Sequence, residues 1–268
     1  MKTTLLNAPA AGYGGDVGDD TPLLRVEGLR KEYGAVTALD GVSFSIRHGE
    51  VVGLLGDNGA GKSTLVNLIA GAVIPTAGRI VIDGEERSFS SPADARAAGI
   101  ETVYQRLALV EIFDTATNLY LGRELKRKGP LGRLGVLDRP TMHREASQAL
   151  KRLPTHFPDV NAPVETMSGG QRQAVAIARA AFWGGRLLLL DEPTAALGVK
   201  ESAGVLEMIG HLVSASPMAM IVISHNIEHV WSVCTRMLVL RQGRLVADVQ
   251  REDTTKTGIV SYIIGADA

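Results

Sequence analysis

Eight consecutive residues, Gly-Asp-Asn-Gly-Ala-Gly-Lys-Ser at positions 56–63, have the types and spacing needed to hold a polyphosphate. The three glycines let the backbone curl until successive N–H groups point inward at phosphate oxygens. Lys62 supplies a mobile cation for the β- and γ-phosphates, and the Ser63 hydroxyl can ligate Mg²⁺. The alternative is a structural glycine-rich turn. The full pattern directly behind the apolar run Val51–Leu55 favours a P-loop, and therefore a nucleoside-triphosphate binder.

Two carboxylates follow a run of four leucines at 187–190. In P-loop enzymes an acidic residue at such a strand end holds Mg²⁺, and Asp191 is placed for that role. Glu192 lies one residue further on, so it leaves the strand in another direction, where it can polarise an attacking water. The alternative is that both residues only cap the next helix. The P-loop in the same chain favours the catalytic interpretation.

A second anion site is encoded at Met167–Gln171, which reads Met-Ser-Gly-Gly-Gln. Ser168 can cap a helix that begins near Gly170, and the two glycines keep the amino end of that helix unobstructed. Free N–H groups, a hydroxyl and a positive helix end together suit an anion. Because the P-loop already holds the phosphates, this second site is surplus for a monomer.

These motifs together resemble the ATP-binding cassette (ABC) ATPases, whose LSGGQ motif appears here as MSGGQ. In that family the loop closes on the γ-phosphate of ATP held by a partner subunit. The resemblance runs from about Leu23 to the C-terminus. It implies an α/β P-loop NTPase fold with an antiparallel β subdomain and an inserted helical subdomain. It also implies ATP and Mg²⁺ as cofactors, ATP hydrolysis, and a head-to-tail pair of cassettes, most simply a homodimer.

The resemblance also assigns roles to single residues. Tyr33 matches the aromatic that stacks on adenine, although a core tyrosine at a strand edge is the alternative. Gln105 matches a glutamine that contacts Mg²⁺ and links to the membrane partner, and His225 matches the switch histidine at the γ-phosphate. The implied catalytic residues are Glu192, His225 and Gln105, and the implied metal ligands are Ser63, Gln105 and Asp191. The implied cofactor-binding residues are Tyr33, Gly56, Asp57, Asn58, Gly59, Ala60, Gly61, Lys62, Ser63, Thr64, Ser168, Gly169, Gly170 and Gln171.

Two positions depart from the family pattern. The family usually has Asp directly after the Ala-Leu of its D-loop, whereas here Ala196-Leu197 is followed by Gly198. This puts in doubt the hydrogen bond that the Asp normally makes across the dimer. Met167 replaces Leu in the SGGQ motif, a nearly volume-conserving change of little consequence.

Strand and helix patterns alternate around these motifs, which predicts a parallel sheet with helices packed on it. The expected strands are Leu23–Val26, Val42–Ile46, Gly78–Ile82, Ile100–Tyr104, Leu187–Leu190 and Met218–Ser224, followed by a hairpin around Gln242-Gly243. The expected helices are Ala93–Ala98, Arg144–Leu153, Gly170–Phe182, Val199–Val213 and Asn226–Cys234.

The chain is expected to form one ABC ATP-binding domain, residues 21–268, behind a flexible tail at 1–20 that is rich in Gly, Ala and Asp. Between about 107 and 165 helical stretches are interrupted by Gly and Pro. We interpret this part, with the helix that follows, as a helical subdomain inserted at about 107–180.

Bulk properties limit the possible functions. Hydrophobic residues make up 45% of 268, enough for a sizeable core, and the net charge of −1 gives no electrostatic case for nucleic acid. The single cysteine, Cys234, permits no internal disulfide and is most simply a core side chain. No apolar stretch approaches the ~20 residues that span a bilayer. We therefore expect a cytosolic chain, or one that attaches to a membrane through a partner. The resemblance to importers, described next, implies the second: a peripheral protein on the cytoplasmic side of the cell membrane.

The segments Gly99–Gln105 and Glu192–Glu201 are similar to those of bacterial monosaccharide importers of the ribose/xylose/fructose type, in a single-cassette form. This resemblance implies a subunit that hydrolyses ATP to power sugar uptake through an integral-membrane permease. A periplasmic or extracellular sugar-binding protein would be an indirect partner. A soluble ABC ATPase acting on a non-membrane target is the alternative.

The segment Arg106–Asn118 is unusually apolar for a loop. One interpretation is a groove for a permease helix, moved when Gln105 contacts the γ-phosphate. The other is that the same residues pack the core of the helical subdomain.

Overall fold

The computed structural model describes residues 21–154, 159–183 and 185–266. These residues form two compact units. The sheet unit comprises the described residues within 12–105, 185–193 and 216–268, and the helical unit comprises those within 106–184 and 194–215. The predicted flexible tail at 1–20 lies outside the described residues.

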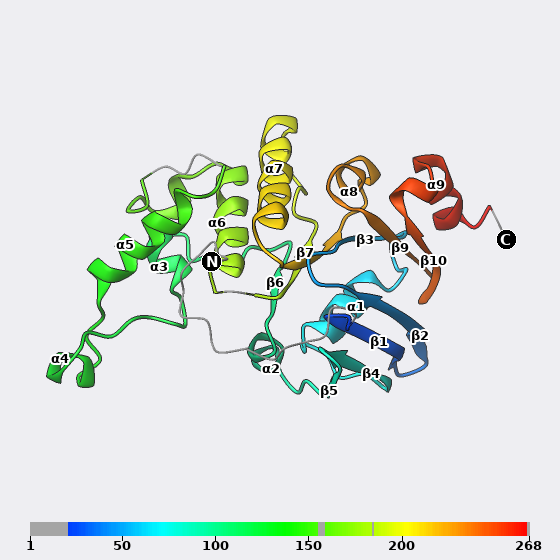
Figure 1. The fold of residues 1–268 in the computed structure, drawn as a ribbon, viewed down its shortest axis with the longest axis horizontal. Helices are drawn as coiled ribbons and strands as arrows, with labels where there is room; N and C mark the ends of the chain where they lie inside the picture. Colours follow the sequence, from blue (N-terminus) through cyan, green and yellow to red (C-terminus); the bar gives the residue numbers. More distant parts are fainter. Residues whose placement is uncertain (1–20, 155–158, 184, 267–268) are drawn as a thin grey trace. The chain divides into compact units, whose positions relative to one another are not determined.

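The sheet unit contains a six-stranded sheet in the spatial order β10–β9–β3–β8–β7–β6. Figure 1 labels its strands β3, β6, β7, β9 and β10. Its strands are β3 (Val51–Leu55), β6 (Ile100–Val103), β7 (Leu187–Asp191), β8 (Ala219–Ile223), β9 (Arg236–Arg241) and β10 (Arg244–Gln250). The order β9–β3–β8–β7–β6 is parallel throughout, and β10 closes one edge as an antiparallel hairpin with β9. All residues of β3 and β8 are buried, which explains why these strands read as unbroken apolar runs.

The parallel order brings the carboxyl ends of β3, β6, β7 and β8 to one edge of the sheet. The loop after β3 leads into helix α1 (Lys62–Ile69), and Gln105, Glu192 and His225 come directly or shortly after the other three strands. In open α/β sheets, ligands bind outside these strand ends. The fold therefore collects residues from four distant segments at one edge.

A second, antiparallel sheet belongs to the same unit. Its strands, in spatial order, are β2 (Val36–Ile46), β1 (Leu24–Tyr33), β4 (Ala77–Ile82) and β5 (Glu85–Arg87). Its inward residues, such as Leu24 and Ile46, share one core cluster with Leu54 and Leu238 of the parallel sheet. The remaining helices of the unit are α2 (Pro92–Ala97), α8 (Ile227–Val233) and α9 (Lys256–Ile264), with a short 3₁₀ turn at Arg251–Asp253.

The helical unit contains α3 (Thr115–Leu119), α4 (Pro130–Arg133), α5 (Arg139–Leu150), a 3₁₀ turn at Val164–Thr166, α6 (Gly169–Phe182) and α7 (Val199–Ala215). Helices α6 and α7 lie side by side, and α3 packs on α5 and α6. Three aromatic rings, Tyr120, Phe182 and Trp183, meet edge to face with centroids 5.1–5.3 Å apart, a favourable arrangement for such quadrupoles. Helix α7 belongs to this unit although the predicted insert ended at about 180.

Several element boundaries differ from the sequence expectation. β1 was expected to end at Val26 but continues to Tyr33, because its later residues pair with both β2 and β4. α5 begins at Arg139 rather than Arg144, because the Asp138 side chain accepts a hydrogen bond from the Thr141 N–H and caps the helix there. α9 was not predicted.

Candidate active site

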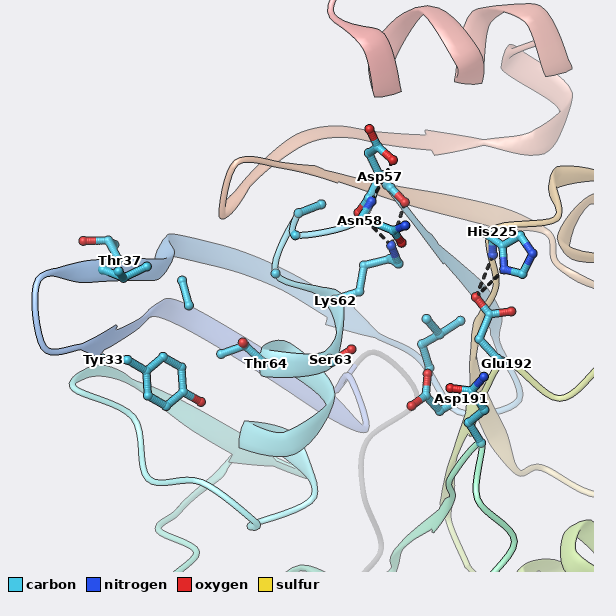
Figure 2. Close-up of a pocket in the computed structure, with 18 residues that line it drawn as sticks. Tyr33, Thr37, Asp57, Asn58, Lys62, Ser63, Thr64, Asp191, Glu192 and His225 are labelled. Carbon is cyan, nitrogen blue, oxygen red and sulfur yellow. Dashed lines mark hydrogen bonds and ion pairs between the residues drawn. The ribbon is translucent and has the colours of Figure 1, made fainter. Parts of the chain in front are cut away.

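A pocket of about 900 Å³ opens at the carboxyl edge of the parallel sheet, within the sheet unit. Figure 2 labels side chains from the P-loop, from the end of β7, from the segment after β8 and from the β1–β2 hairpin around it. Its lining residues are Tyr33, Val36, Thr37, Ala38, Gly56, Asp57, Asn58, Gly59, Ala60, Gly61, Lys62, Ser63, Thr64, Gln105, Asp191, Glu192, Ile223 and His225. Every predicted nucleotide, metal and catalytic residue outside the SGGQ motif thus lines one pocket.

Two glycines of the P-loop are required by space as well as by conformation. At Gly56, φ is +146° and an added Cβ would lie 2.3 Å from the Leu240 carbonyl oxygen. At Gly61, φ is +104° and a Cβ would lie 2.7 Å from the Ala38 carbonyl oxygen. Any side chain at either position would push the loop out of its curl, so the N–H groups stay available for an anion.

The Lys62 ammonium is held by its own loop. Its Nζ donates to the carbonyl oxygens of Gly56 at 2.6 Å and Asp57 at 2.9 Å. Burial lowers the pKa of Lys62, and the neighbouring carboxylates, Glu192 foremost, oppose this shift. The two carbonyl oxygens that Lys62 contacts are neutral acceptors. An anionic phosphate can replace them, because its attraction to the ammonium is stronger.

Glu192 is fixed by donors from Ser224 and His225, the two residues that directly follow β8. Its Oε2 accepts from the Ser224 hydroxyl at 3.1 Å, and its Oε1 accepts from the His225 backbone N–H at 2.9 Å. The His225 ring nitrogen Nδ1 also lies 2.9 Å from Oε1 (Figure 2). The backbone of Glu192 has φ of +51°, a conformation uncommon for a residue with a side chain. This turn at the end of β7 separates the directions of Glu192 and Asp191.

Three oxygen-bearing side chains in the pocket suit a magnesium ion: the hydroxyl of Ser63, the amide of Gln105 and the carboxylate of Asp191. Burial first, and then the charge of Glu192, raise the pKa of Asp191, while Lys62 lowers it. A half-buried carboxylate next to another carboxylate is the setting that a divalent cation stabilises. Within the described ranges, no group of three or more His, Cys, Asp or Glu side chains forms a metal cluster. The hydroxyl, amide and carboxylate oxygens fit Mg²⁺, which proteins usually hold by one or two carboxylates together with water and phosphate oxygens.

Tyr33 lies at the end of β1, where the chain turns into β2. Its side chain is 48% exposed, and Lys31 Nζ lies 5.1 Å from its ring centroid. This exposure excludes the alternative of a buried core tyrosine. The half-exposed ring lines the pocket, where an aromatic face can stack on a base (Figure 2).

The SGGQ segment belongs to the helical unit, at the start of α6. Ser168 and Gln171 form a reciprocal capping box: Ser168 Oγ accepts from the Gln171 N–H at 3.4 Å, and Gln171 Oε1 accepts from the Ser168 N–H at 2.9 Å. The local structure is the capped helix end that the sequence predicted.

Sequence reasoning missed five residues of this region. Val36, Thr37, Ala38 and Ile223 line the pocket, and Ser224 binds Glu192. These are common residue types, and none of them belongs to a recognisable sequence motif. The β1–β2 turn at Gly34 would have been the available hint, since it places the residues that follow beside Tyr33.

Known proteins that are similar to this chain are ATP-binding subunits of transporters, in agreement with the P-loop pocket described above. A model of the ABC transporter family matches residues 39–195. The chain is 45% identical to a fructose import ATP-binding protein of Rhizobium meliloti over 247 residues, covering 91% of this chain and 95% of that protein. It is 44% identical to a xylose/arabinose import ATP-binding protein of Sulfolobus acidocaldarius, covering 87% and 90%. A ribose import ATP-binding protein of Burkholderia thailandensis is 40% identical, but the match covers only 47% of its length.

Two solved structures share the fold. A nucleotide-free ATP-binding cassette from an ABC transporter has a TM-score of 0.75 at 25% identity, covering 90% of this chain and 96% of that one. The cbiO1 subunit of a Clostridium perfringens ABC transporter complex has a TM-score of 0.73 at 27% identity, covering 92% and 96%. The matched segment spans more than half of the chain and the two import proteins align over most of their length. The chain therefore belongs to the ABC transporter family, and its fold is that of an ATP-binding cassette.

Proposed function

We propose that this chain is the ATP-hydrolysing subunit of an importer that takes up a monosaccharide through a partner permease. The observation that carries the hydrolytic activity is Glu192, oriented by Ser224 and His225 in the pocket that also contains Lys62. The identity of 45% to a fructose import ATP-binding protein, over nearly the whole of both chains, supports the import role.

In the proposed site the P-loop N–H groups hold the phosphates, and Lys62 moves from its two carbonyl acceptors to the β- and γ-phosphates. Tyr33 stacks on the adenine. Glu192 orients and polarises the attacking water, since its carboxylate is already fixed by two protein donors. His225, with a side chain 73% exposed, can reach the γ-phosphate while it contacts Glu192.

Ser63, Gln105 and Asp191 would hold the magnesium ion. When bound, the ion neutralises charge that develops on the phosphate oxygens. Gln105 is also the last residue of the sheet unit before the chain enters the helical unit. We propose that the helical unit is the inserted helical subdomain and that residues 21–268 form one ATP-binding domain.

In the proposed working unit, Ser168, Gly169, Gly170 and Gln171 of one copy bind the γ-phosphate of ATP held in the pocket of a second copy. This assembly is a homodimer with two composite sites across an isologous interface. The motif supplies the needed donors, because Ser168 Oγ caps α6 as an acceptor and its hydroxyl proton still points to a separate acceptor.

The helical unit offers a surface for the permease. Ile112 is 71% exposed and Phe113 37%, whereas Leu107, Leu109 and Val110 are half-buried. Their exposure supports a docking role for Ile112 and Phe113, and half-burial supports packing within the unit for the other three. We propose that the exposed pair contacts a cytoplasmic segment of the permease, with the sugar-binding protein an indirect partner.

Among the described residues no helix is long and apolar enough to cross a membrane. We propose attachment through the permease at the cytoplasmic face of the cell membrane. A soluble ABC ATPase with a non-membrane target is the second candidate, because the pocket alone supports any ATP-driven output.

Uptake measurements in cells that lack the gene test the proposal. We expect loss of uptake of one of radiolabelled fructose, xylose or ribose, restored by the wild-type gene but not by Glu192→Gln. Sucrose uptake serves as the control for a general membrane defect. Unchanged uptake of all three monosaccharides, with ATP hydrolysis by the purified chain, would favour the soluble candidate.

A further inference from the structure

The two glycines of the SGGQ motif are each covered by a residue at the start of α7 or just before it. A Cβ added at Gly169 would lie 3.1 Å from Cδ2 of Leu197. A Cβ added at Gly170 would lie 2.9 Å from Cβ of Glu201, closer than real Cβ contacts. Gly170 is therefore needed for this packing, while a side chain at Gly169 would require a small shift of Leu197. The stem of Glu201 lies directly on the amino end of α6.

The carboxylate of Glu201 is surrounded by donors. Its Oε2 accepts from the Gly198 N–H at 3.2 Å, so it also caps the start of α7. The pKa of Glu201 lies below its usual value, because the Ser168 hydroxyl first, and then the backbone N–H groups of Gly198 and Gly170, favour its charged form. One carboxylate thus connects the SGGQ loop to the D-loop within the helical unit.

The donors that Glu201 uses are the ones that an incoming phosphate needs. Ser168 Oγ already accepts from the Gln171 N–H, so its one proton is free for a single acceptor. The Gly170 N–H is likewise one donor. Neither group can serve Glu201 and a phosphate oxygen fully at the same time.

Gly198 carries no side chain that would repel the Glu201 carboxylate. A Cβ at residue 198 would lie 3.8 Å from Glu201 Oε2, so an acidic side chain there would place a second negative charge beside Glu201. The absence of Asp at 198, noted above as a departure from the family pattern, is compatible with the carboxylate at 201.

We propose that Glu201 is the internal anion of the SGGQ loop: its carboxylate occupies Ser168 and Gly170 in the nucleotide-free chain, and the γ-phosphate of the partner's ATP displaces it. This inference rests on the proposed function, because the phosphate comes from the composite site. Breaking the contacts of Glu201 offsets part of the binding energy of ATP, so Glu201 sets the ATP concentration at which two cassettes close. Its release also frees Gly198, which links phosphate binding to the D-loop.

The test uses Glu201→Gln, which keeps the shape and one acceptor but removes the charge. Both the parent and the variant carry Glu192→Gln to prevent turnover. Dimer formation is followed by light scattering during an ATP titration. We expect the midpoint ATP concentration to fall about three- to tenfold, because an uncharged amide competes less well with phosphate. Glu207→Gln, an exposed glutamate on the same helix, is the matched control and should leave the midpoint unchanged.

If Glu201 only supported the structure of the SGGQ loop, its replacement would shift the midpoint ATP concentration in the opposite direction. Loss of support for the SGGQ loop would raise the midpoint. A raised or unchanged midpoint would contradict the proposed exchange of the Glu201 carboxylate for the γ-phosphate. ATP binding to the isolated P-loop pocket, measured on monomers with a fluorescent ATP analogue, should be the same in all variants. If the Glu192→Gln parent does not dimerise with ATP at all, the proposed composite site is wrong and the exchange falls with it. If the parent dimerises and only the shift is missing, the exchange alone is wrong.

Discussion

Glu192 shows how one side chain is prepared for chemistry by its backbone. The residue turns away from the direction of β7 at φ of +51°, and its carboxylate then meets Ser224 and His225 at the end of β8. Strained conformations of this kind persist where surrounding contacts determine them, and they cluster at active sites. The turn gives two successive carboxylates, Asp191 and Glu192, separate directions and separate roles.

Replacement of this carboxylate should stop turnover and spare binding. Glu192→Gln keeps the size of the side chain, and its amide can still contact Ser224 and His225, so the pocket should remain intact. We expect ATP hydrolysis to fall about 10²- to 10⁴-fold, since a general base is lost. Phosphate release and the affinity for an ATP analogue are the two measurements. Near wild-type hydrolysis would remove Glu192 from the proposed role.

The P-loop lysine should behave in the opposite way. Lys62→Ala removes the cation that Gly56 and Asp57 hold ready with their carbonyl groups. A charged hydrogen bond contributes ~1.5–3 kcal/mol, so affinity for ATP should fall about tenfold to a hundredfold. Equilibrium titration with a fluorescent ATP analogue measures this, with the exposed Lys128→Ala as control. Equal affinities in both variants would contradict the role given to Lys62.

Cys234 provides a residue-level test of the core. It is buried, and burial raises the pKa of its thiol, so little thiolate forms at neutral pH. We expect no reaction with an aromatic disulfide reagent in the native chain and one thiol per chain after unfolding. Rapid modification of the native protein would mean that the α8–β9 junction opens.

At the level of elements, Asn118 organises the segment that carries Ile112 and Phe113. Asn118 is fully buried in α3. Its amide nitrogen donates to the carbonyl oxygens of Val110, Phe113 and Asp114, and its Oδ1 accepts from the Val110 N–H at 2.8 Å. One side chain thus replaces the regular hydrogen bonds that this irregular segment lacks.

Loss of that side chain should loosen the proposed permease surface. Asn118→Ala leaves several backbone groups without partners, which should lower the free energy of unfolding by ~2–4 kcal/mol. Urea denaturation measures this change. Hydrogen exchange at the Val110 amide should also accelerate. The control is Thr117→Ala, because only the backbone N–H of Thr117 is bound to Asp114. Unchanged protection of Val110 would show that another contact orders the segment.

Particular elements show what the sequence could predict. β3, β7 and β8 were found because fully buried parallel strands are continuous apolar runs. α2 was expected at Ala93–Ala98, one residue from its observed bounds, and the structure adds a capping box at Ser91. The early start of α5 depended on Asp138, one acidic residue among many possible caps.

The site residues likewise divide into those that the sequence could predict and those that it could not. Contiguous motifs such as the P-loop were readable because the phosphate chemistry fixes residue types at fixed spacing. Ser224 and the β1–β2 turn residues were not, because only the strand order brings them to the pocket. Nor could Glu201 be found, since its role depends on the packing of Gly170 under its stem.

At the level of the whole molecule, the proposed mechanism requires two copies. The P-loop pocket lies in the sheet unit and the SGGQ loop in the helical unit. Both are equipped for the same γ-phosphate, and two chains related by a two-fold axis would form two composite sites. ATP then favours the closed dimer and its hydrolysis weakens it, which converts bond cleavage into motion of the permease.

Mixing two inactive variants tests this arrangement. Lys62→Ala disables the P-loop and Ser168→Arg blocks the SGGQ loop, so neither variant alone should hydrolyse ATP. In the mixed dimer one composite site combines the intact P-loop of the Ser168→Arg chain with the intact SGGQ loop of the Lys62→Ala chain. We expect partial ATPase activity, or occlusion of labelled ATP, to appear on mixing.

A mixture that stays inactive, although subunit exchange is demonstrated by fluorescence transfer, has two explanations. Either both sites must be intact at once, or each site forms within one chain. Wild type mixed with the Lys62→Ala/Ser168→Arg double variant separates them. In its mixed dimer each composite site pairs an intact half with a disabled half, so a site shared between chains predicts that excess double variant suppresses activity. A site formed within one chain predicts that the wild-type half stays active, and that result would contradict the proposed assembly.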